Sequence, residues 1–118
     1  MRNWIGTGCV LGALAVALGA FGAHGLRSRV EPADLEIWHT AVLYQLVHAP
    51  ALVLYGLFAR GRDTRGLPGW CFLVGTLLFS GSLYALVLGG PRGLGAVTPF
   101  GGALLIAGWV SFGLECRR

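Results

Sequence analysis

Charged residues divide the chain into four apolar segments. The uncharged runs cover residues 3–26, 37–59, 66–91 and 93–114, and they are 24, 23, 26 and 22 residues long. A helix of about 20 apolar residues crosses the hydrocarbon core of a bilayer. The pattern therefore predicts an all-α membrane protein, a single domain of four transmembrane helices at about 3–26, 37–59, 66–90 and 97–114.

A seam of small residues runs along the first predicted span. Its members recur at steps of four and three residues, the 3.5 period of left-handed helix packing; they are Gly8, Gly12, Ala15, Gly19 and Gly22. Small residues let helix backbones approach closely in lipid. We expect this seam to place the first span in the bundle centre or in a dimer interface, and we expect Gly12→Leu to be tolerated less well than Gly56→Leu.

The second span has a polar face on an otherwise apolar helix. At 100° per residue, one side collects five polar residues, Thr40, Tyr44, Gln45, His48 and Tyr55. Val42 and Leu46 lie on the opposite side, which we expect to face lipid. Pro50 removes one backbone hydrogen bond and predicts a bend.

The third span has two distinct flanks. Thr76, Ser80 and Tyr84 lie within 80° of one another on a helical wheel, whereas Gly75 and Ser82 lie on a different flank. Small and polar residues are typical of contacts between membrane helices. The two flanks therefore predict two neighbouring helices.

Prolines indicate where two helices begin. Pro32 favours the start of the second helix, which makes Trp38 a candidate anchor at the membrane interface. Thr98 followed by Pro99 predicts a capping residue and a first helical position. Only 16 residues then remain up to Leu114, or about 24 Å of helix. We therefore expect the glycine-rich residues 89–97 to enter the membrane edge.

The positive charge follows the ends of the spans. The chain has nine arginines, no lysine and a formal net charge of +4. Because these arginines flank the spans, they predict topology and not nucleic-acid binding. One side would carry Arg2, Arg60, Arg62, Arg65, Arg117 and Arg118, and the other would carry Arg27, Arg29 and Arg92. The split of six against three predicts cytoplasmic termini. We also expect the protein to be an integral protein of a bacterial cytoplasmic (inner) membrane.

The sequence lacks the usual patterns of a catalytic site. It contains no phosphate-binding glycine loop and no Cys-x-x-Cys pair, and none of the spans contains a carboxylate. The three cysteines, Cys9, Cys71 and Cys116, do not suggest a disulfide framework. We therefore expect no enzymatic activity, no cofactor and no bound metal. Haem or metal binding through His24 and His39, near one outer face, is the weaker alternative.

Several strings, in order along nearly the whole chain, resemble the YgdD-like family of small integral membrane proteins. The strings are GAFGAHGL at 19–26, TA at 40–41, YQ at 44–45, HA at 48–49, FSGSLY at 79–84, TPFGG at 98–102 and GW at 108–109. This family, a domain of unknown function, is related to vertebrate transmembrane protein 256. The resemblance implies a four-helix membrane bundle but no activity. Its motif positions here are His24, Tyr44, Gln45, His48, Ser82, Tyr84, Pro99, Gly101, Gly102 and Trp109.

Two functions remain open at this point. The first is a non-catalytic accessory or structural component that lies in the lipid bilayer and forms a homo-oligomer or packs onto a larger membrane complex. The alternative is a small proton-linked transporter or channel, with a polar path around His48 that includes Tyr44, Gln45, Ser80, Ser82 and Tyr84. Under the first hypothesis we expect a neutral His48 imidazole, bonded to Tyr84 or Ser80.

Overall fold

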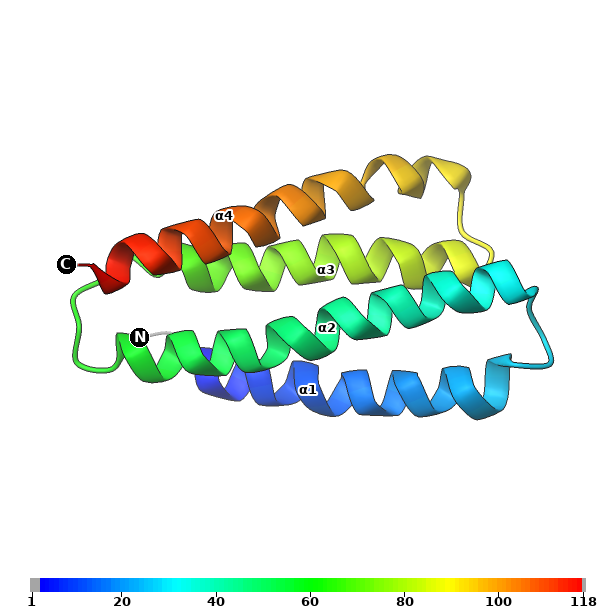
Figure 1. Ribbon diagram of the computed structural model, residues 1–118, viewed down its shortest axis with the longest axis horizontal. Helices are drawn as coiled ribbons and strands as arrows, with labels where there is room; N and C mark the ends of the chain where they lie inside the picture. The colour runs from blue at the N-terminus through cyan, green and yellow to red at the C-terminus, as the bar shows by residue number, and fades with distance from the viewer. Residues whose placement is uncertain (1–2, 118) are drawn as a thin grey trace.

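Four long helices build the protein, as seen in a computed structural model that describes residues 3–117 (Figure 1). They are α1 (Trp4–Phe21), α2 (Pro32–Ala59), α3 (Leu67–Val87) and α4 (Thr98–Cys116). A π-helical turn, η1 (Gly22–Leu26), extends α1, and a 3₁₀ helix, η2 (Arg92–Ala96), precedes α4. No strand occurs within residues 3–117. The four predicted helices are thus confirmed, and each segment is long and apolar enough to cross a membrane.

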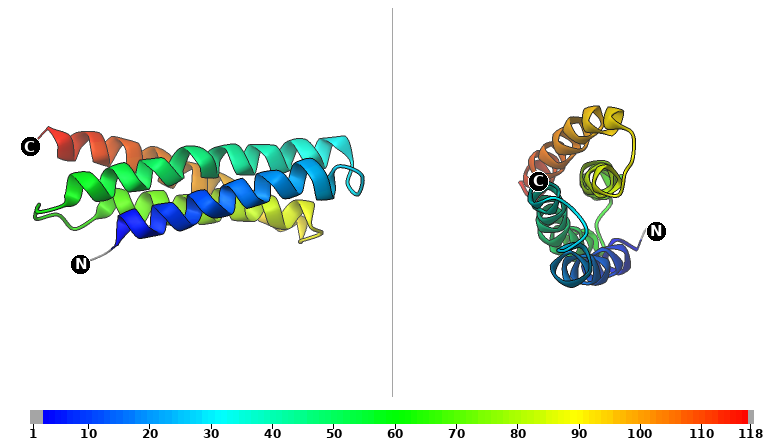
Figure 2. Two further views of the ribbon diagram at one scale, coloured as in Figure 1. Left: turned by 90° about the horizontal axis from the view of Figure 1, so that it is seen from below. Right: turned by 90° about the vertical axis from the view of Figure 1, so that its right-hand side faces the viewer.

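The helices lie side by side in an elongated bundle that measures 49 × 26 × 20 Å. Sequential neighbours pack together: α1 on α2, α2 on α3, and α3 on α4. Figure 1 shows α1 and α4 on opposite sides of the α2 and α3 pair, with the start of α1, the α2–α3 loop and the end of α4 at one end of the bundle. Helix α1 therefore lies at an edge, as the end-on view of Figure 2 also shows, and its predicted place in the bundle centre is wrong.

The small-residue seam of α1 lies against α2. Ala15 is fully buried, and a Cβ atom added to Gly8 would lie 2.6 Å from Val53 Cγ2 and 2.8 Å from the carbonyl oxygen of Ala49. A Cβ at Gly12 would make an ordinary contact, 3.7 Å from Ala49 Cβ. The seam is therefore occupied within the same chain, because close approach of α2 fills it.

The predicted ranking of Gly12 and Gly56 is wrong. A Cβ added to the buried Gly56 would lie 2.7 Å from Ile5 Cγ1 and 2.9 Å from the backbone nitrogen of Ile5. The first turn of α1 crosses α2 at this point, so Gly56 has less room than Gly12. The helical wheel of α2 could not show this contact, because it depends on where α1 begins.

Helix α2 starts at Pro32, as predicted, and continues through Pro50 for 28 residues. The predicted interfacial anchor, Trp38, is instead 1% exposed. Its indole Nε1 donates a hydrogen bond to the carbonyl oxygen of Leu18 at 2.8 Å, and its ring lies 4.7 Å from that of Tyr84. The anchor prediction is wrong because Gly22, which has no side chain, lets α1 cover the indole.

The junction of α3 and α4 depends on glycines. A Cβ added to Gly75 would lie 2.9 Å from Leu105 Cδ2, and one at Gly108 would lie 2.8 Å from the Phe72 ring. The capping prediction for Thr98 is wrong: Val97 occupies the N-cap position, and the Thr98 hydroxyl bonds to Ser82. Since α4 extends over 19 residues to Cys116, the helix is also longer than predicted.

Candidate functional site

The polar residues within the bundle form contacts between helices. The buried ones are Gln45, His48, Thr76, Ser80 and Ser82. They come from α2 and α3, the two helices that have a neighbour on each side. We treat this group and its bonded partners as the candidate functional site.

Gln45 connects three helices. Its Nε2 donates to the carbonyl oxygen of Leu11 in α1 at 2.8 Å, and its Oε1 accepts from the Tyr84 hydroxyl of α3 at 2.7 Å. A second bond between α2 and α3 runs from the Ser80 hydroxyl to the carbonyl oxygen of Ala41 at 2.7 Å. The nitrogen and the oxygen of the Gln45 amide are thus both hydrogen-bonded. This avoids the free-energy cost of burying an unpaired polar group.

His48 has a bond at each ring nitrogen. Nε2 lies 3.0 Å from the indole Nε1 of Trp109 in α4, and Nδ1 lies 2.7 Å from the carbonyl oxygen of Tyr44. An indole N–H can only donate, so Nε2 must be the acceptor, and a carbonyl can only accept, so Nδ1 must carry the proton. The geometry therefore selects a neutral imidazole with hydrogen on Nδ1. The predicted partners, Tyr84 and Ser80, are wrong, because both hydroxyls bond elsewhere on α2.

The two flanks of α3 contact two helices. Ser80 and Tyr84 bond to α2, whereas Ser82 bonds to Thr98 at the start of α4. Thr76 is 2% exposed and its hydroxyl oxygen has no hydrogen-bond partner among the described residues. The hydroxyls of α3 thus hold it to neighbours on both sides, with Thr76 as the exception.

Two members of the predicted polar face, Thr40 and Tyr44, have exposed side chains. Thr40 is exposed and bonds to the carbonyl oxygen of Glu36 in its own helix. Tyr44 is 39% exposed, with its ring 4.2 Å from the Phe79 ring. Val42, predicted to face lipid, is instead buried, because α1 packs over that side of α2, where a Cβ at Gly19 would lie 3.3 Å from Val42 Cγ1.

The motif positions carried over by resemblance are spread over the bundle. His24 is exposed in η1, and Pro99 is exposed in the first turn of α4. A Cβ at Gly101 would collide with the backbone of Phe79, and one at Gly102 would touch the Phe79 ring at 3.7 Å. Gly101 therefore brings α4 close to α3, which places Trp109 within reach of His48.

Histidines and cysteines do not gather into a ligand set. Within the described residues, no three or more His, Cys, Asp or Glu side chains are grouped so that they could hold a metal ion. His24 and His39 are both exposed. Cys9, Cys71 and Cys116 are free thiols, of which only Cys71 is buried.

A further polar cluster, which the sequence did not reveal, lies at the arginine-rich end. The Tyr55 and Thr64 hydroxyls donate to Glu115 Oε1 at 3.0 and 2.9 Å. Thr64 Oγ1 also accepts from the backbone N–H of Gly66 at 3.2 Å. This Tyr55–Thr64–Glu115 cluster fastens the α2–α3 loop to the end of α4. The sequence signals were Tyr55, on the predicted polar face of the second span, and an isolated carboxylate beside the last arginines.

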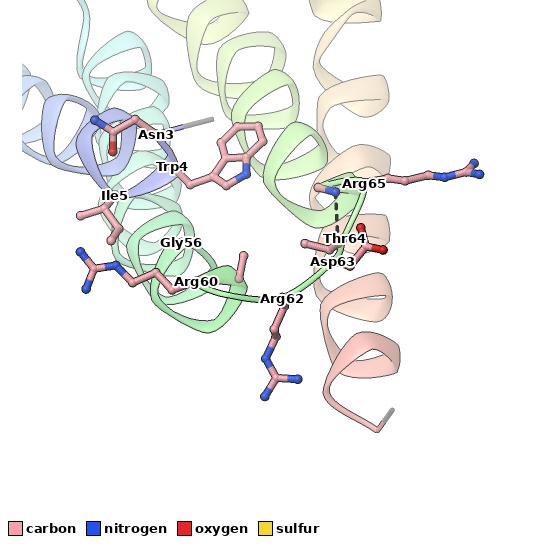
Figure 3. A pocket seen from close by; sticks show the side chains of 11 residues that line it. Asn3, Trp4, Ile5, Gly56, Arg60, Arg62, Asp63, Thr64 and Arg65 are labelled. Atoms are coloured by element: carbon pink, nitrogen blue, oxygen red, sulfur yellow. Dashed lines mark hydrogen bonds between the residues drawn. The ribbon is translucent and has the colours of Figure 1, made fainter. Parts of the chain in front are cut away.

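A cavity of about 470 Å³ opens beside this cluster, between the first turn of α1, the end of α2 and the α2–α3 loop (Figure 3). Trp4, Ile5 and Gly56 form its apolar wall, and Arg60, Arg62 and Arg65 belong to the loop that borders it. An adjoining cavity of about 290 Å³ is lined by Phe58, Arg62, Asp63, Thr64 and Glu115.

Comparison with known proteins identifies relatives of the whole chain. Residues 18–102 match the family described as "Protein of unknown function (DUF423)". The chain is 41% identical to the UPF0382 membrane protein YwdK of Bacillus subtilis (strain 168) over 113 residues, which cover 93% of this chain and 92% of the relative. It is 40% identical to the UPF0382 membrane protein SAB0533 of Staphylococcus aureus (strain bovine RF122 / ET3-1) over 111 residues, 93% of this chain and 91% of the relative.

No solved structure matches the chain. The resemblance seen in the sequence is confirmed at the level of the family: small bacterial membrane proteins without an assigned function. The range matched by the family, residues 18–102, contains Gln45, His48 and Tyr84, and the two relatives each cover 93% of the chain. The chain therefore belongs to the DUF423 family and is a small integral membrane protein.

Proposed function

We propose that the protein is a non-catalytic membrane component, a small bundle that associates with other membrane helices, either its own copies or a larger complex. The observation that carries this proposal is the use of the polar side chains within the spans. Gln45, His48 and Ser80 all bond to backbone or side-chain groups of neighbouring helices. Such bonds are the usual way in which polar side chains hold membrane helices together.

His48 supports a structural role more than proton transfer. Its two partners are an indole N–H and a backbone carbonyl, and neither exchanges protons readily with an imidazole. The Phe72 and Trp109 rings lie 5.9 Å from the imidazole ring. A protonated imidazole would also direct an N–H at the N–H of Trp109, which would remove one of the two bonds.

The outer faces of the bundle support association with other helices. The exposed side of α1 carries small residues, namely Cys9, Ala13, Ala17 and Ala20. The exposed side of α4 likewise carries Ala103, Ala107 and Gly113. Small residues allow another helix to approach closely in lipid. Because α2 already fills the glycine seam of α1, a partner would contact this outer face instead.

Gentle extraction from native membranes tests the proposal. The protein should run in mild detergent as a particle larger than its 12.4 kDa monomer, containing several copies or a second chain in fixed proportion. The particle is sized by light scattering, and its chains are identified by mass spectrometry. A lone stable monomer would contradict the proposal.

Proton flux in proteoliposomes distinguishes the structural role of the polar residues from the transporter hypothesis. If the polar residues are structural, the purified protein should produce no proton flux above that of empty vesicles under an imposed pH gradient. A flux that His48→Gln abolishes without loss of folded protein would overturn the structural assignment of the site.

A further inference from the structure

The arginine-rich end of the bundle combines a cavity with unpaired positive charge. Arg60, Arg62 and Arg65 border the cavity, together with a single carboxylate, Asp63. Within residues 3–117, none of the three guanidinium groups forms an ion pair, and Arg62 instead lies 4.2 Å from the centre of the Phe58 ring. The three positive charges exceed the negative charges of Asp63 and of Glu115, which bonds to the lining residue Thr64, and this surplus favours an anion.

Helix ends add to this preference. The first turn of α1 and the residue preceding α3, Gly66, both line the cavity. N–H groups at the start of a helix lack partners within the helix, and the helix dipole places positive charge there. Asn3 satisfies the N–H of Gly6 through its Oδ1 at 2.8 Å. Two helix N-termini and one C-terminus, that of α2, border the cavity. The helix dipoles together therefore add positive charge to it.

The α2–α3 loop is held in place at this cavity. Thr64 lies between Arg62 and Arg65, and its hydroxyl bonds to Glu115 and Gly66. In Figure 3 the three arginine side chains extend from the loop in different directions, with Trp4 and Ile5 across the opening. Hydrogen bonds thus hold the loop backbone, and the three arginine side chains extend from it at the edge of the cavity.

We infer that this cavity binds the phosphate group of an anionic phospholipid. The opposite wall is apolar, built from Trp4, Ile5 and Gly56. A lipid would place its phosphate near the arginines and its glycerol and upper chains on this wall. Basic pockets between membrane helices recognise anionic headgroups in this way. A zwitterionic lipid is disfavoured, because its ammonium group would meet the arginines.

Thermal unfolding of the purified full-length protein in mixed micelles tests this inference. Phosphatidylglycerol should raise the midpoint by a few degrees more than the same mole fraction of phosphatidylcholine, because ligands that bind only the folded state stabilise it. In the triple variant Arg60→Gln/Arg62→Gln/Arg65→Gln, that difference should fall to about a third or less. Native mass spectrometry should show the same loss of retained phosphatidylglycerol.

A matched control removes the same charge from the other end of the bundle. Arg27→Gln/Arg29→Gln/Arg92→Gln should keep the wild-type difference between the two lipids. Equal loss in both triple variants would overturn the inference, since it would indicate a general charge effect. Equal stabilisation by the two lipids would also overturn it. If the first triple variant does not fold, Arg60→Gln alone is measured, and an unchanged lipid difference there would count against the cavity.

Unfolding in the presence of inorganic phosphate shows whether the cavity binds a phospholipid or a soluble phosphate compound. Phosphate in phosphatidylcholine micelles should leave the midpoint within about a degree of its value in chloride at equal ionic strength. A shift equal to that of phosphatidylglycerol would overturn the lipid assignment in favour of a site for soluble phosphate compounds.

Discussion

His48 is the residue whose state the structure defines most fully. The bond from Trp109 and the bond to Tyr44 together require hydrogen on Nδ1. Its place near the middle of a 23-residue uncharged run was enough to predict a neutral ring. Its partner could not be predicted, because Trp109 lies 61 residues away and the rotation of α4 depends on contacts at Gly101 and Gly108.

His48→Ala should lower the free energy of unfolding by about 1–2 kcal/mol, because Trp109 loses its acceptor and a cavity forms. His48→Gln should recover much of that loss, since its amide oxygen can accept the same bond. Denaturant unfolding in detergent measures both variants.

Trp109→Phe and the double variant with His48→Ala complete a thermodynamic cycle. The coupling energy should be about 0.6 kcal/mol and at most about 1.7 kcal/mol, the average and the maximum for hydrogen bonds between membrane helices. A coupling energy near zero would show that the bond contributes nothing to stability.

At the scale of the helices, the positions of charged residues and prolines predict where each helix lies. The contacts of individual side chains are harder to predict. The uncharged runs located all four helices, and Pro32 located the start of α2. Trp38 and Thr98 were misjudged because their roles depend on neighbouring helices: α1 covers the indole, and Ser82 takes the hydroxyl. Periodicity also identified the seam of α1, but it could not show which helix fills it.

Glycines on one face of α1 should differ sharply in tolerance. Gly8→Ala should reduce stability and folded yield, because its Cβ would lie 2.8 Å from a backbone oxygen of α2. Gly12→Ala should be nearly neutral, because its Cβ has normal contact distances. Thermal unfolding of the two variants side by side measures the difference. Equal behaviour would mean that α1 and α2 are not this close at Gly8.

Thr64→Val should loosen the α2–α3 loop, because it removes the bonds to Tyr55, Glu115 and Gly66. Trypsin cleaves after arginine, so cleavage at Arg60, Arg62 and Arg65 should become several-fold faster. Thr40→Val is the control, since that exposed threonine bonds only within its own helix. Unchanged cleavage in Thr64→Val would show that the cluster does not hold the loop.

For the whole molecule, the arginine count predicts an orientation. We expect both termini and the α2–α3 loop to be cytoplasmic, with six arginines on that side against three on the other. A cysteine introduced at the exposed Ser28 should react with an impermeant maleimide in intact cells. The exposed Cys116 should react only after the membrane is opened. The reverse labelling would show the opposite orientation.

We expect the outer faces of the bundle to contact other membrane helices. A photoreactive cross-linker attached to a single cysteine in native membranes tests it directly. The positions are the native Cys9 and the variants Ala13→Cys and Ala17→Cys on the outer face of α1. Leu54→Cys, on the bulky exposed face of α2, is the control.

The predicted result is a light-dependent product heavier than the 12.4 kDa chain at all three α1 positions and little or none at Leu54. The product should contain a second copy of the chain or one defined partner chain. Cross-links to lipid alone at every α1 position would contradict the claim.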